Sequence, residues 1–334
     1  MQVKTLVLAA VGLFAGMAKA QILPTFGDSR SGSTGMQFLK IAPDARSLSL
    51  GGAYVAIAND VSSMYWNPAG ITQTDTGKVN VQVSNTQYFG DIYANYAGIV
   101  AKVGKLNYLG FQVFNMNYGT MKETTVFDPN GTGRTFTLSN YYIGLTYAQI
   151  LTNSFSFGIN ARYANEGYPG VSIHNMLFDL GLKYDVGVKN ARFGINFSNF
   201  GFNVNPDGKA QVLKFNGPTD ITNFTTVTVP GIFRLGAAFD PIMGYKHNLT
   251  VAAQLNHPTD NNETYAFGAE YTFKRMLYGR LGYEFASDEA YRAPAFGLGF
   301  KLKRNFGGVN IDYGFLAKNR LGNIHRVSIA FNLR

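Results

Sequence analysis

From about residue 78 onward, apolar and polar residues alternate in one stretch of the chain after another. Residues 79–84 alternate valine with polar residues, and residues 265–273 place an aromatic residue or alanine at every second position. A period of two is typical of a β-strand with one apolar face. We predict fourteen strands, at 78–89, 91–103, 105–119, 134–151, 154–165, 171–186, 191–201, 225–240, 247–257, 262–274, 276–287, 293–304, 306–318 and 322–333.

The connections between these strands alternate in length. The two longest, 120–133 and 202–224, both follow an odd-numbered strand, whereas even-numbered connections such as 104, 152–153 and 305 are short. Bacterial outer-membrane barrels have an even number of strands, long extracellular loops and short periplasmic turns. Most of the strands reach the roughly 9–11 residues that a tilted strand needs to cross the hydrocarbon. The pattern therefore predicts an all-β fold: a transmembrane antiparallel β-barrel of about fourteen strands over residues 78–334.

Composition agrees with a barrel. Charged residues make up only 15% of the chain and aromatic residues 14%, and there is no cysteine. In a membrane barrel the lipid-facing half of each strand is apolar, and this lowers the content of charged residues. The absence of cysteine excludes disulfides, thiol chemistry and cysteine zinc sites. A soluble secreted β-sandwich or lectin is the alternative, although so many long alternating segments are unusual for one.

The first twenty residues have the pattern of a secretory signal peptide. Lys4 precedes an apolar stretch at 6–17, which is too short to span a bilayer as a helix, and Ala18-Lys19-Ala20 follows. We expect cleavage near Ala20, followed by assembly in the outer membrane of a Gram-negative bacterium. The alternative is an uncleaved anchor.

Residues 21–77 show no strand pattern and include the stretch MYWNPAGI at 64–71. Fourteen strands would enclose a wide lumen unless something fills it. We therefore predict that 21–77 form an N-terminal hatch that plugs the barrel. Within it, Asn67-Pro68-Ala69-Gly70 is expected to form a rigid turn, because Pro68 disfavours helix.

Charged residues lie on the polar faces of the predicted strands, and we expect them to line the lumen. The inward set contains seven basic and six acidic residues. Such a balance suits internal ion pairs better than an ion-selective pore, where one sign of charge would dominate. The alternative is that each merely solvates a wet interior. The predicted lumen charge network consists of Arg162, Asp179, Lys183, Arg192, Arg234, Glu270, Arg280, Glu284 and Asp312, with Asp185, Asp240, Lys301 and Lys303 also inward.

The segment 38–71 carries a recognisable motif. A Phe-Leu-x-Ile-x-Pro-Asp-Ala-Arg run leads through a Gly-Gly step and an Asp-containing stretch to Trp-Asn-Pro-Ala-Gly. With fourteen strands behind it, this resembles the FadL-like outer-membrane transport superfamily, and in particular its PorV/PorQ branch in Bacteroidetes. The matching hatch residues include Phe38, Pro43, Asp44, Arg46, Gly51, Gly52, Asp60, Trp66, Asn67, Pro68, Ala69 and Gly70.

The resemblance implies a function in the type IX secretion system. Its barrels are expected to bind translocon or attachment-complex proteins, or C-terminal signal-domain cargo, at the cell surface. The long connection 202–224 is our candidate partner-binding loop, unless its apolar residues fold back over the lumen. Those residues are Phe202, Val204, Val212, Leu213, Phe215, Ile221 and Phe224. The alternatives are a FadL-like passive transporter of hydrophobic small molecules, and a barrel with neither role.

No enzyme signature is present. The four histidines are isolated and no metal-binding spacing occurs. We therefore expect no catalytic residues, no metal and no cofactor, although a lipid or detergent molecule could bind. The net charge of +9 is dispersed among strands, so lipopolysaccharide and other outer-membrane lipids are more plausible anionic neighbours than nucleic acid.

Overall fold

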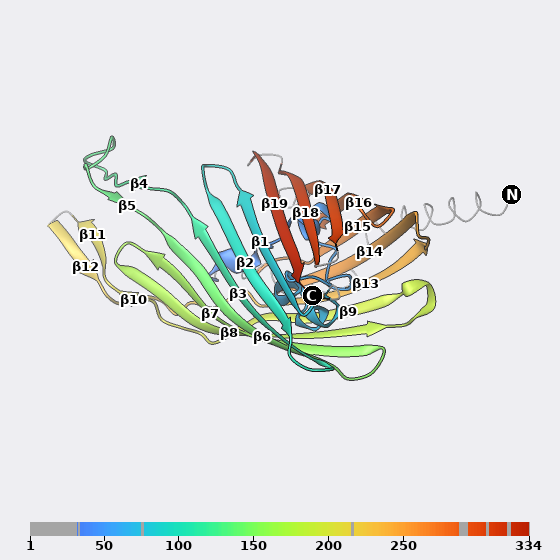
Figure 1. The fold of residues 1–334 in the computed structure, drawn as a ribbon. Helices are drawn as coiled ribbons and strands as arrows, with labels where there is room; N and C mark the ends of the chain where they lie inside the picture. Colours follow the sequence, from blue (N-terminus) through green and yellow to red (C-terminus); the bar gives the residue numbers. More distant parts are fainter. Residues whose placement is uncertain are drawn as a thin grey trace, which may run out of the picture.

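The computed structural model of the chain describes residues 32, 34–74, 77–214, 217–286, 293–304, 307–318 and 322–333. It is dominated by a closed antiparallel barrel, in which the first strand pairs with the last from Val79↔Leu333 to Gln87↔His325 (Figure 1). The fourteen wall strands are β1 (Val79–Gln87), β2 (Tyr93–Lys102), β3 (Asn107–Asn117), β6 (Ser139–Ile150), β7 (Phe155–Tyr168), β8 (Val171–Asp185), β9 (Arg192–Gly201), β13 (Ile232–Ile242), β14 (His247–Pro258), β15 (Thr264–Phe273), β16 (Leu277–Ala286), β17 (Ala293–Arg304), β18 (Gly307–Lys318) and β19 (Gly322–Leu333). The predicted fold class and strand count are confirmed.

The alternation seen in the sequence becomes the two faces of the wall. In β1, Gln82, Ser84 and Thr86 are buried toward the lumen, whereas Val83 between them is exposed on the outside. Large apolar side chains are exposed in the same way on most other strands. An apolar outer surface and a polar interior are what a membrane barrel requires.

The two ends of the barrel differ in their connections. We call the end with the short connections 103–106, 151–154, 186–191, 243–246 and 274–276 the turn end; 186–191 includes η4 (Val188–Asn190). The opposite end, the loop end, carries 118–138 and 202–231. These two connections contain β4 (Met121–Lys122), β5 (Thr135–Phe136), β10 (Asp207–Gly208), β11 (Ala210–Lys214) and β12 (Gly217–Ile221). The β4–β5 and β11–β12 hairpins extend away from the barrel on the same side (Figure 1).

Two strands begin several residues later than predicted. The strand expected at 134–151 begins at Ser139, because Thr135 and Phe136 pair with β4 instead. The strand expected at 225–240 begins at Ile232. In the β-branched run 225–229, Val227 instead bridges Val204, which lies earlier in the same connection. Pro230, which has no backbone N–H to give to a sheet, separates it from the wall.

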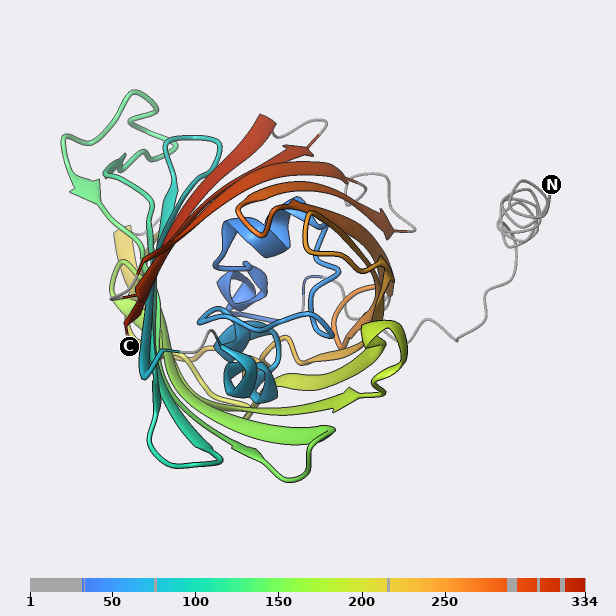
Figure 2. The same cartoon turned by 45° about the vertical axis from the view of Figure 1, so that its right-hand side comes forward.

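Residues 34–74, which we call the inner segment, lie inside the barrel (Figure 2). They form η2 (Gln37–Lys40), α2 (Ala45–Ser49), α3 (Ser63–Trp66) and η3 (Pro68–Gln73). Their apolar side chains supply much of the three buried clusters of the molecule. The predicted signal peptide, with its cleavage site, and residues 21–31 lie outside the described residues. Among the residues described, no helix is both long and apolar enough to cross a membrane.

Candidate functional site

The stretch 64–71 contains the junction of two short helices of the inner segment. It is not a simple turn: α3 ends at Trp66, and Pro68 begins η3 after the single residue Asn67. Proline is tolerated at the first position of a helix, where its missing N–H has no helical partner to lose. The Asn67 amide donates to the carbonyl of Val55 at 3.1 Å and to that of Leu182 in β8 at 3.0 Å. The side chain thereby connects the junction of the two helices to Val55 of the inner segment and to the wall.

Glycines on the wall let the inner segment approach its backbone directly. A Cβ added at Gly158 in β7 would lie 2.4 Å from the carbonyl carbon of Pro68, and one at Gly282 in β16 would lie 2.0 Å from that of Leu50. Both distances are shorter than any side chain permits. Further wall glycines lie against the segment in the same way, at 181, 194, 268, 297 and 314. The predicted Gly51-Gly52 step adopts positive φ angles of 62° and 84°, where a side chain would be strained.

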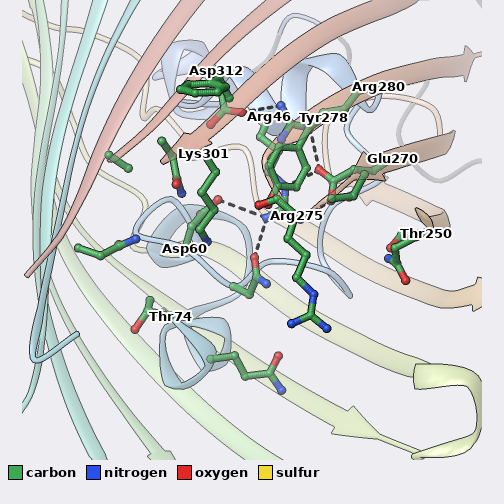
Figure 3. A pocket seen from close by; sticks show the side chains of 18 of the residues that line it. Arg46, Asp60, Thr74, Thr250, Glu270, Arg275, Tyr278, Arg280, Lys301 and Asp312 are labelled. Carbon is green, nitrogen blue, oxygen red and sulfur yellow. Dashed lines mark hydrogen bonds and ion pairs between the residues drawn. The ribbon is translucent and has the colours of Figure 1, made fainter. Parts of the chain in front are cut away.

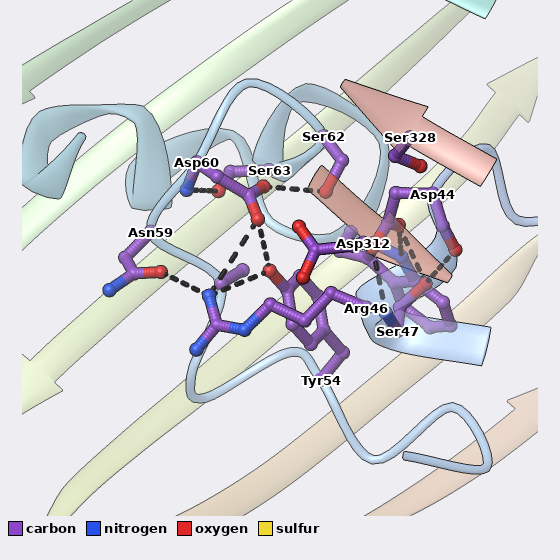
Figure 4. Close-up of polar contacts among 12 residues, drawn as sticks. Asp44, Arg46, Ser47, Tyr54, Asn59, Asp60, Ser62, Ser63, Asp312 and Ser328 are labelled. Atoms are coloured by element: carbon purple, nitrogen blue, oxygen red, sulfur yellow. Dashed lines mark hydrogen bonds and ion pairs between the residues drawn. The ribbon is translucent and has the colours of Figure 1, made fainter. Parts of the chain in front are cut away.

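Asp44 organises the start of the inner segment (Figure 4). Its carboxylate caps α2 by accepting the backbone N–H of Ser47 at 2.7 Å, and it accepts the indole N–H of Trp66 at 3.1 Å. The Arg326 guanidinium donates to the Asp44 carbonyl at 3.1 Å. Burial, reinforced by the charge of Asp60, raises the pKa of the Asp44 carboxyl above its usual value.

Arg46 lies at the centre of an ion-pair network on the turn-end side of the segment (Figure 3). Its Nε and Nη2 each donate to Glu270 at 2.8 Å. Glu270 also accepts from Arg280 at 2.7 Å, and Arg280 donates to Asp312 at 2.6 Å. Asp60 completes the network as a second ion-pair partner of Arg46, at 3.7 Å. These residues line a cavity of about 650 Å³, the turn-end cavity, whose other walls are mostly polar.

A second cavity lies on the other side of the inner segment, toward the loop end. This loop-end cavity has a volume of about 420 Å³. Tyr65 and Trp66 of the segment line it, together with Arg234 from β13 and Arg326 from β19. Gly51 and Gly52 also line it, so the predicted hatch motif faces this cavity more than any other.

The predicted lumen charges form several separate clusters. Arg162 and Asp179 are both buried and lie 2.6 Å apart, and Arg192 lies 3.2 Å from Asp240. Lys183 is buried and donates to the Ala58 carbonyl at 2.9 Å. The others are placed apart from one another: Asp185 near the turn end accepts from Gln73, Glu284 lines the loop-end cavity, Lys301 lines the turn-end cavity, and the Lys303 side chain lies outside the described ones.

Three charged residues that hold the inner segment were missed in the sequence. Arg326 sits on the inward parity of the last strand, so the alternation could have revealed it. Glu166 accepts the Met36 N–H at 2.5 Å, but the predicted strand stopped one residue short of it. Asp260 binds Lys40 at 2.6 Å from a short loop, and no sequence signal marks it.

The remaining motif residues are buried in the segment. Phe38 stacks on Phe114 of the wall with ring centroids 6.4 Å apart. Pro43, Ala69 and Gly70 are also buried. The motif therefore describes how the segment fits its barrel. That the segment acts as a hatch, and that the hatch ends at residue 77, stay predictions.

The candidate partner-binding loop divides into exposed and inward-facing parts. Phe202, which directly follows β9, is 66% exposed. Val204, expected on the outer face, instead lies against the interior cluster around Phe38 together with Val227. Ile221 and Phe224 are partly exposed, whereas Phe215 and the side chains of Val212 and Leu213 lie outside the described ones.

Comparison with known proteins supports the resemblance drawn from the motif. The family model described as type IX secretion system protein PorV matches residues 25–176. The resemblance to the PorV/PorQ family is thereby confirmed over those residues. A search of curated proteins finds no significant match. Among the described residues, no group of three or more metal-binding side chains comes together.

Solved structures with a similar fold are FadL-like channels. The Ralstonia pickettii toluene transporter TbuX superposes with a TM-score of 0.63 at 13% identity, over 88% of this chain and 99% of that one. The CymD monoaromatic hydrocarbon channel gives 0.61 at 15% identity, over 87% and 97%. The P. putida toluene transporter TodX gives 0.60 at 13% identity, over 87% and 98%. At these identities the likeness establishes the fold alone, the closed β-barrel that these three structures share. None of the three descriptions names an enzyme.

Proposed function

We propose that the protein is an outer-membrane barrel whose loop end binds a protein of the type IX secretion or attachment machinery at the cell surface. The observation that carries the proposal is the pair of hairpins, β4–β5 and β11–β12, that extend beyond the wall at the loop end (Figure 1). The match to the PorV family model indicates which machinery to test first. Candidate partners are a translocon barrel, an attachment-complex protein and C-terminal signal-domain cargo.

The β4–β5 hairpin is suited to protein contact. Glu123 and Arg134 form an ion pair at 2.7 Å across it, and the Thr132 hydroxyl donates to the Glu123 carboxylate at 3.0 Å. Its tip exposes Val126 by 94% and Phe127 by 76%. Exposed apolar side chains rimmed by polar ones are typical of protein-binding surfaces.

The second hairpin offers another surface close by. β11 and β12 pair from Ala210↔Ile221 to Lys214↔Gly217, and the exposed Phe202 lies at the base of this loop. Val204 and Val227 pack against the buried cluster around Phe38, so this loop lies over the loop-end opening of the lumen. A partner bound to the loop would lie close to that opening. Orientation with the loop end outside follows from the short-turn rule for outer-membrane barrels.

The occupied lumen also favours binding over passage. The inner segment separates the turn-end cavity from the loop-end cavity, and it is held by buried hydrogen bonds on several strands. A protein-binding barrel needs no path past such a segment, whereas a diffusion channel needs one through it, around it or out through the wall.

The proposal is tested by recovering partners from the native outer membrane. The tagged full-length protein is purified in mild detergent as wild type, as the Val126→Ser/Phe127→Ser variant and with residues 205–221 deleted. We expect a stoichiometric secretion-system protein with the wild type and at least a tenfold loss of it with either change. Lys122→Ser, a polar change in the same hairpin, should leave recovery intact. Equal recovery with all variants that assemble would sink the idea.

One observation favours a second candidate, passive transport of hydrophobic small molecules. The loop-end cavity is lined by Tyr65, Trp66 and Tyr88, and the FadL-like neighbours are described as hydrocarbon channels or toluene transporters. Mass spectrometry of the same purified samples separates the two. A lone barrel that carries apolar molecules would favour transport.

A further inference from the structure

The described turns at the turn end of the barrel contain charged residues of one sign only. Their basic residues are Lys105, Lys189, Lys246, Lys274 and Arg275, and none of these five turns contains an acidic residue. The two long connections at the loop end, 118–138 and 202–231, contain both signs. Basic side chains next to a membrane surface attract anionic lipid headgroups. The turn end therefore favours an anionic neighbour, whereas the loop end has no such bias.

Two of these turns are joined to each other and bring basic and aromatic side chains together. The backbone N–H of Lys274 donates to the carbonyl of Lys246 at 2.8 Å. The Lys274 ammonium lies 5.2 Å from the ring centroid of Phe273, and the imidazole of His247 lies 5.4 Å from the same centroid. His247 Nδ1 is also hydrogen-bonded to the Tyr271 hydroxyl at 2.6 Å. We call Lys246, His247 and Lys274, all of them exposed, the basic cluster.

The basic cluster lies outside the lumen and makes no ion pair among the described residues. None of the ion pairs found there includes Lys246, His247 or Lys274. None of the three lines the turn-end cavity. Arg275, which follows Lys274 in the same turn, does line that cavity and lies 5.6 Å from the ring centroid of Tyr245 (Figure 3). The two neighbours in this turn therefore differ in the side of the wall that they serve.

An apolar groove begins beside the basic cluster on the lipid-facing side of the wall. The part nearest the turn end has a volume of about 550 Å³ and is lined by Leu277, and a deeper part of about 470 Å³ is lined by Leu281. The two parts are continuous, because Tyr271, Gly279 and Leu298 line both. We call them together the outer groove.

The outer groove is centred on a glycine of β16. Leu277 and Leu281 are exposed by 51% and 58%, and Gly279 lies between them on the same face of the strand. A Cβ added at Gly279 would have nothing within 4 Å. From Leu277 to Leu281 the groove follows the strand for about 13 Å, at roughly 3.3 Å per residue. A flexible acyl chain can fill such a hollow and cover its apolar walls.

We propose that the basic cluster and the outer groove together bind one anionic phospholipid of the periplasmic leaflet. Its phosphate would contact Lys246 and Lys274, and one acyl chain would lie across Gly279. Charge-assisted hydrogen bonds from ammonium groups are strong phosphate contacts. When the Tyr271 hydroxyl donates to Nδ1 of His247, the imidazole keeps its hydrogen on Nε2 and can donate it to the headgroup as well.

Other occupants fit only one part of this site. A zwitterionic lipid would fill the groove but bring no net negative charge to the basic cluster. An acidic protein would match the charge but would not enter a groove that faces lipid. The site does not depend on the proposed protein-binding function, although both use the orientation that places the short turns in the periplasm.

The proposal is tested by native mass spectrometry of the full-length protein in a non-ionic detergent. The protein is mixed with phosphatidylglycerol, with phosphatidylcholine of the same acyl chains, or with glycerol 3-phosphate, which has no acyl chains. We expect at least fivefold higher occupancy of the first lipid by phosphatidylglycerol than by phosphatidylcholine, and no retained glycerol 3-phosphate. Equal occupancy by the two lipids would overturn the proposal, and so would retention of glycerol 3-phosphate as strong as that of the lipid.

Surface variants locate the two parts of the site. Lys246→Gln/Lys274→Gln should remove the preference for phosphatidylglycerol and leave the occupancy by phosphatidylcholine unchanged. Gly279→Leu, which fills the outer groove, should lower the occupancy by both lipids at least fivefold. Lys105→Gln, in the turn between β2 and β3, and Arg275→Gln are the matched controls and should bind as the wild type does.

Two results would refute the assignment. One is an unaltered lipid preference in the assembled double lysine variant, and the other is unaltered occupancy in Gly279→Leu. An acidic protein recovered with the wild type but not with the double variant, without any lipid preference, would likewise replace the lipid with a protein partner. Should the double variant fail to assemble, Gly279→Leu and the comparison of the two lipids still decide.

Discussion

The two sides of the inner segment use arginine differently. On the turn-end side, Arg46 and Arg280 share Glu270 at 2.7–2.8 Å, and Asp312 completes the chain of charges. On the loop-end side, Arg234 and Arg326 are surrounded by aromatic rings and neutral oxygens. Arg280, Arg234 and Arg326 are all deeply buried, whereas Arg46 is partly exposed. The two sides differ in whether a carboxylate accepts a hydrogen bond from the guanidinium.

This difference bears on how much each arginine contributes to stability. A guanidinium whose charge is matched by a hydrogen-bonded carboxylate holds the inner segment in place through an ion pair. One that is hydrogen-bonded to neutral groups contributes those hydrogen bonds and no ion pair. The predictions below test that division, beginning with the largest expected effect.

Removing the shared carboxylate should damage the protein most. Glu270→Gln leaves Arg46 and Arg280 buried with half of their negative partners gone. We expect a loss of about 3–5 kcal/mol in the free energy of unfolding, typical of breaking a buried ion pair. The measurement is urea-induced unfolding of the refolded barrel in detergent micelles. Glu123→Gln, the same change in an exposed pair, should cost under about 1 kcal/mol. Equal costs for the two variants would contradict the structural role.

Filling the space at a wall glycine should loosen the inner segment. A Cβ at Gly282 would collide with the Leu50 backbone, so we expect Gly282→Ala to destabilise by about 1–3 kcal/mol. Trypsin cleavage at Lys40 and Arg46 of the segment should become faster. Gly279→Ala lies on the same strand with nothing within 4 Å of its added Cβ, and it should behave as the wild type. If both variants resist trypsin equally, the close contact is not holding the segment.

A loop-end arginine should matter less to folding than the turn-end carboxylate. Arg326→Met removes three hydrogen bonds to neutral groups and a nearby positive charge that favours the ionised Asp44 carboxyl, but it breaks no ion pair among the described residues. We expect a loss of about 1–2 kcal/mol in the free energy of unfolding, measured in the same urea titration. A loss as large as that of Glu270→Gln would show that Arg326 is primarily structural.

The strands of the wall could be predicted from the sequence, because a strand with one apolar and one polar face alternates apolar and polar residues. That pattern located all fourteen strands and placed Arg162 and Glu270 toward the lumen. It failed where the chain leaves the sheet without losing alternation, as at Val227, whose partner Val204 lies earlier in the same connection. Local pattern contains no information about such long-range pairing.

The interior was less predictable. The motif identified the residues of the inner segment, but pairs such as Arg46–Glu270 join positions 224 residues apart. Inward glycines such as Gly158 and Gly282 were visible in the alternation, yet only the structure shows what backbone lies against them. Which arginines are hydrogen-bonded to a carboxylate likewise depends on the register of several strands around the barrel.

At the loop end, the Asp260 carboxylate forms an ion pair with Lys40 of the inner segment, and this pair makes the stability of the protein depend on pH. Asp260 accepts from Lys40 at 2.6 Å and from Gln37 at 2.8 Å, which ties the start of the inner segment to the β14–β15 loop. Burial raises the pKa of the Asp260 carboxyl. The hydrogen bonds from Lys40, Thr34 and Gln37 lower that pKa by more, so the net pKa lies below its usual value. A carboxyl whose folded pKa is lowered stabilises the fold above its unfolded pKa of about 3.9 and loses that contribution as the pH falls toward the folded value.

Asp260→Asn should therefore be less stable than the wild type at pH 6, by about 1 kcal/mol, and the difference should shrink below about pH 4. The measurement is the thermal midpoint of both proteins from pH 3 to pH 6, followed by circular dichroism in a non-ionic detergent. Asp128→Asn, in the exposed β4–β5 loop, should follow the wild type throughout. A difference that stays constant across this range would mean that Asp260 contributes through its shape alone. Among the described residues, the loop end would then have no stabilising ion pair between the inner segment and the rest of the barrel, whereas the turn end has the Arg46–Glu270 pair.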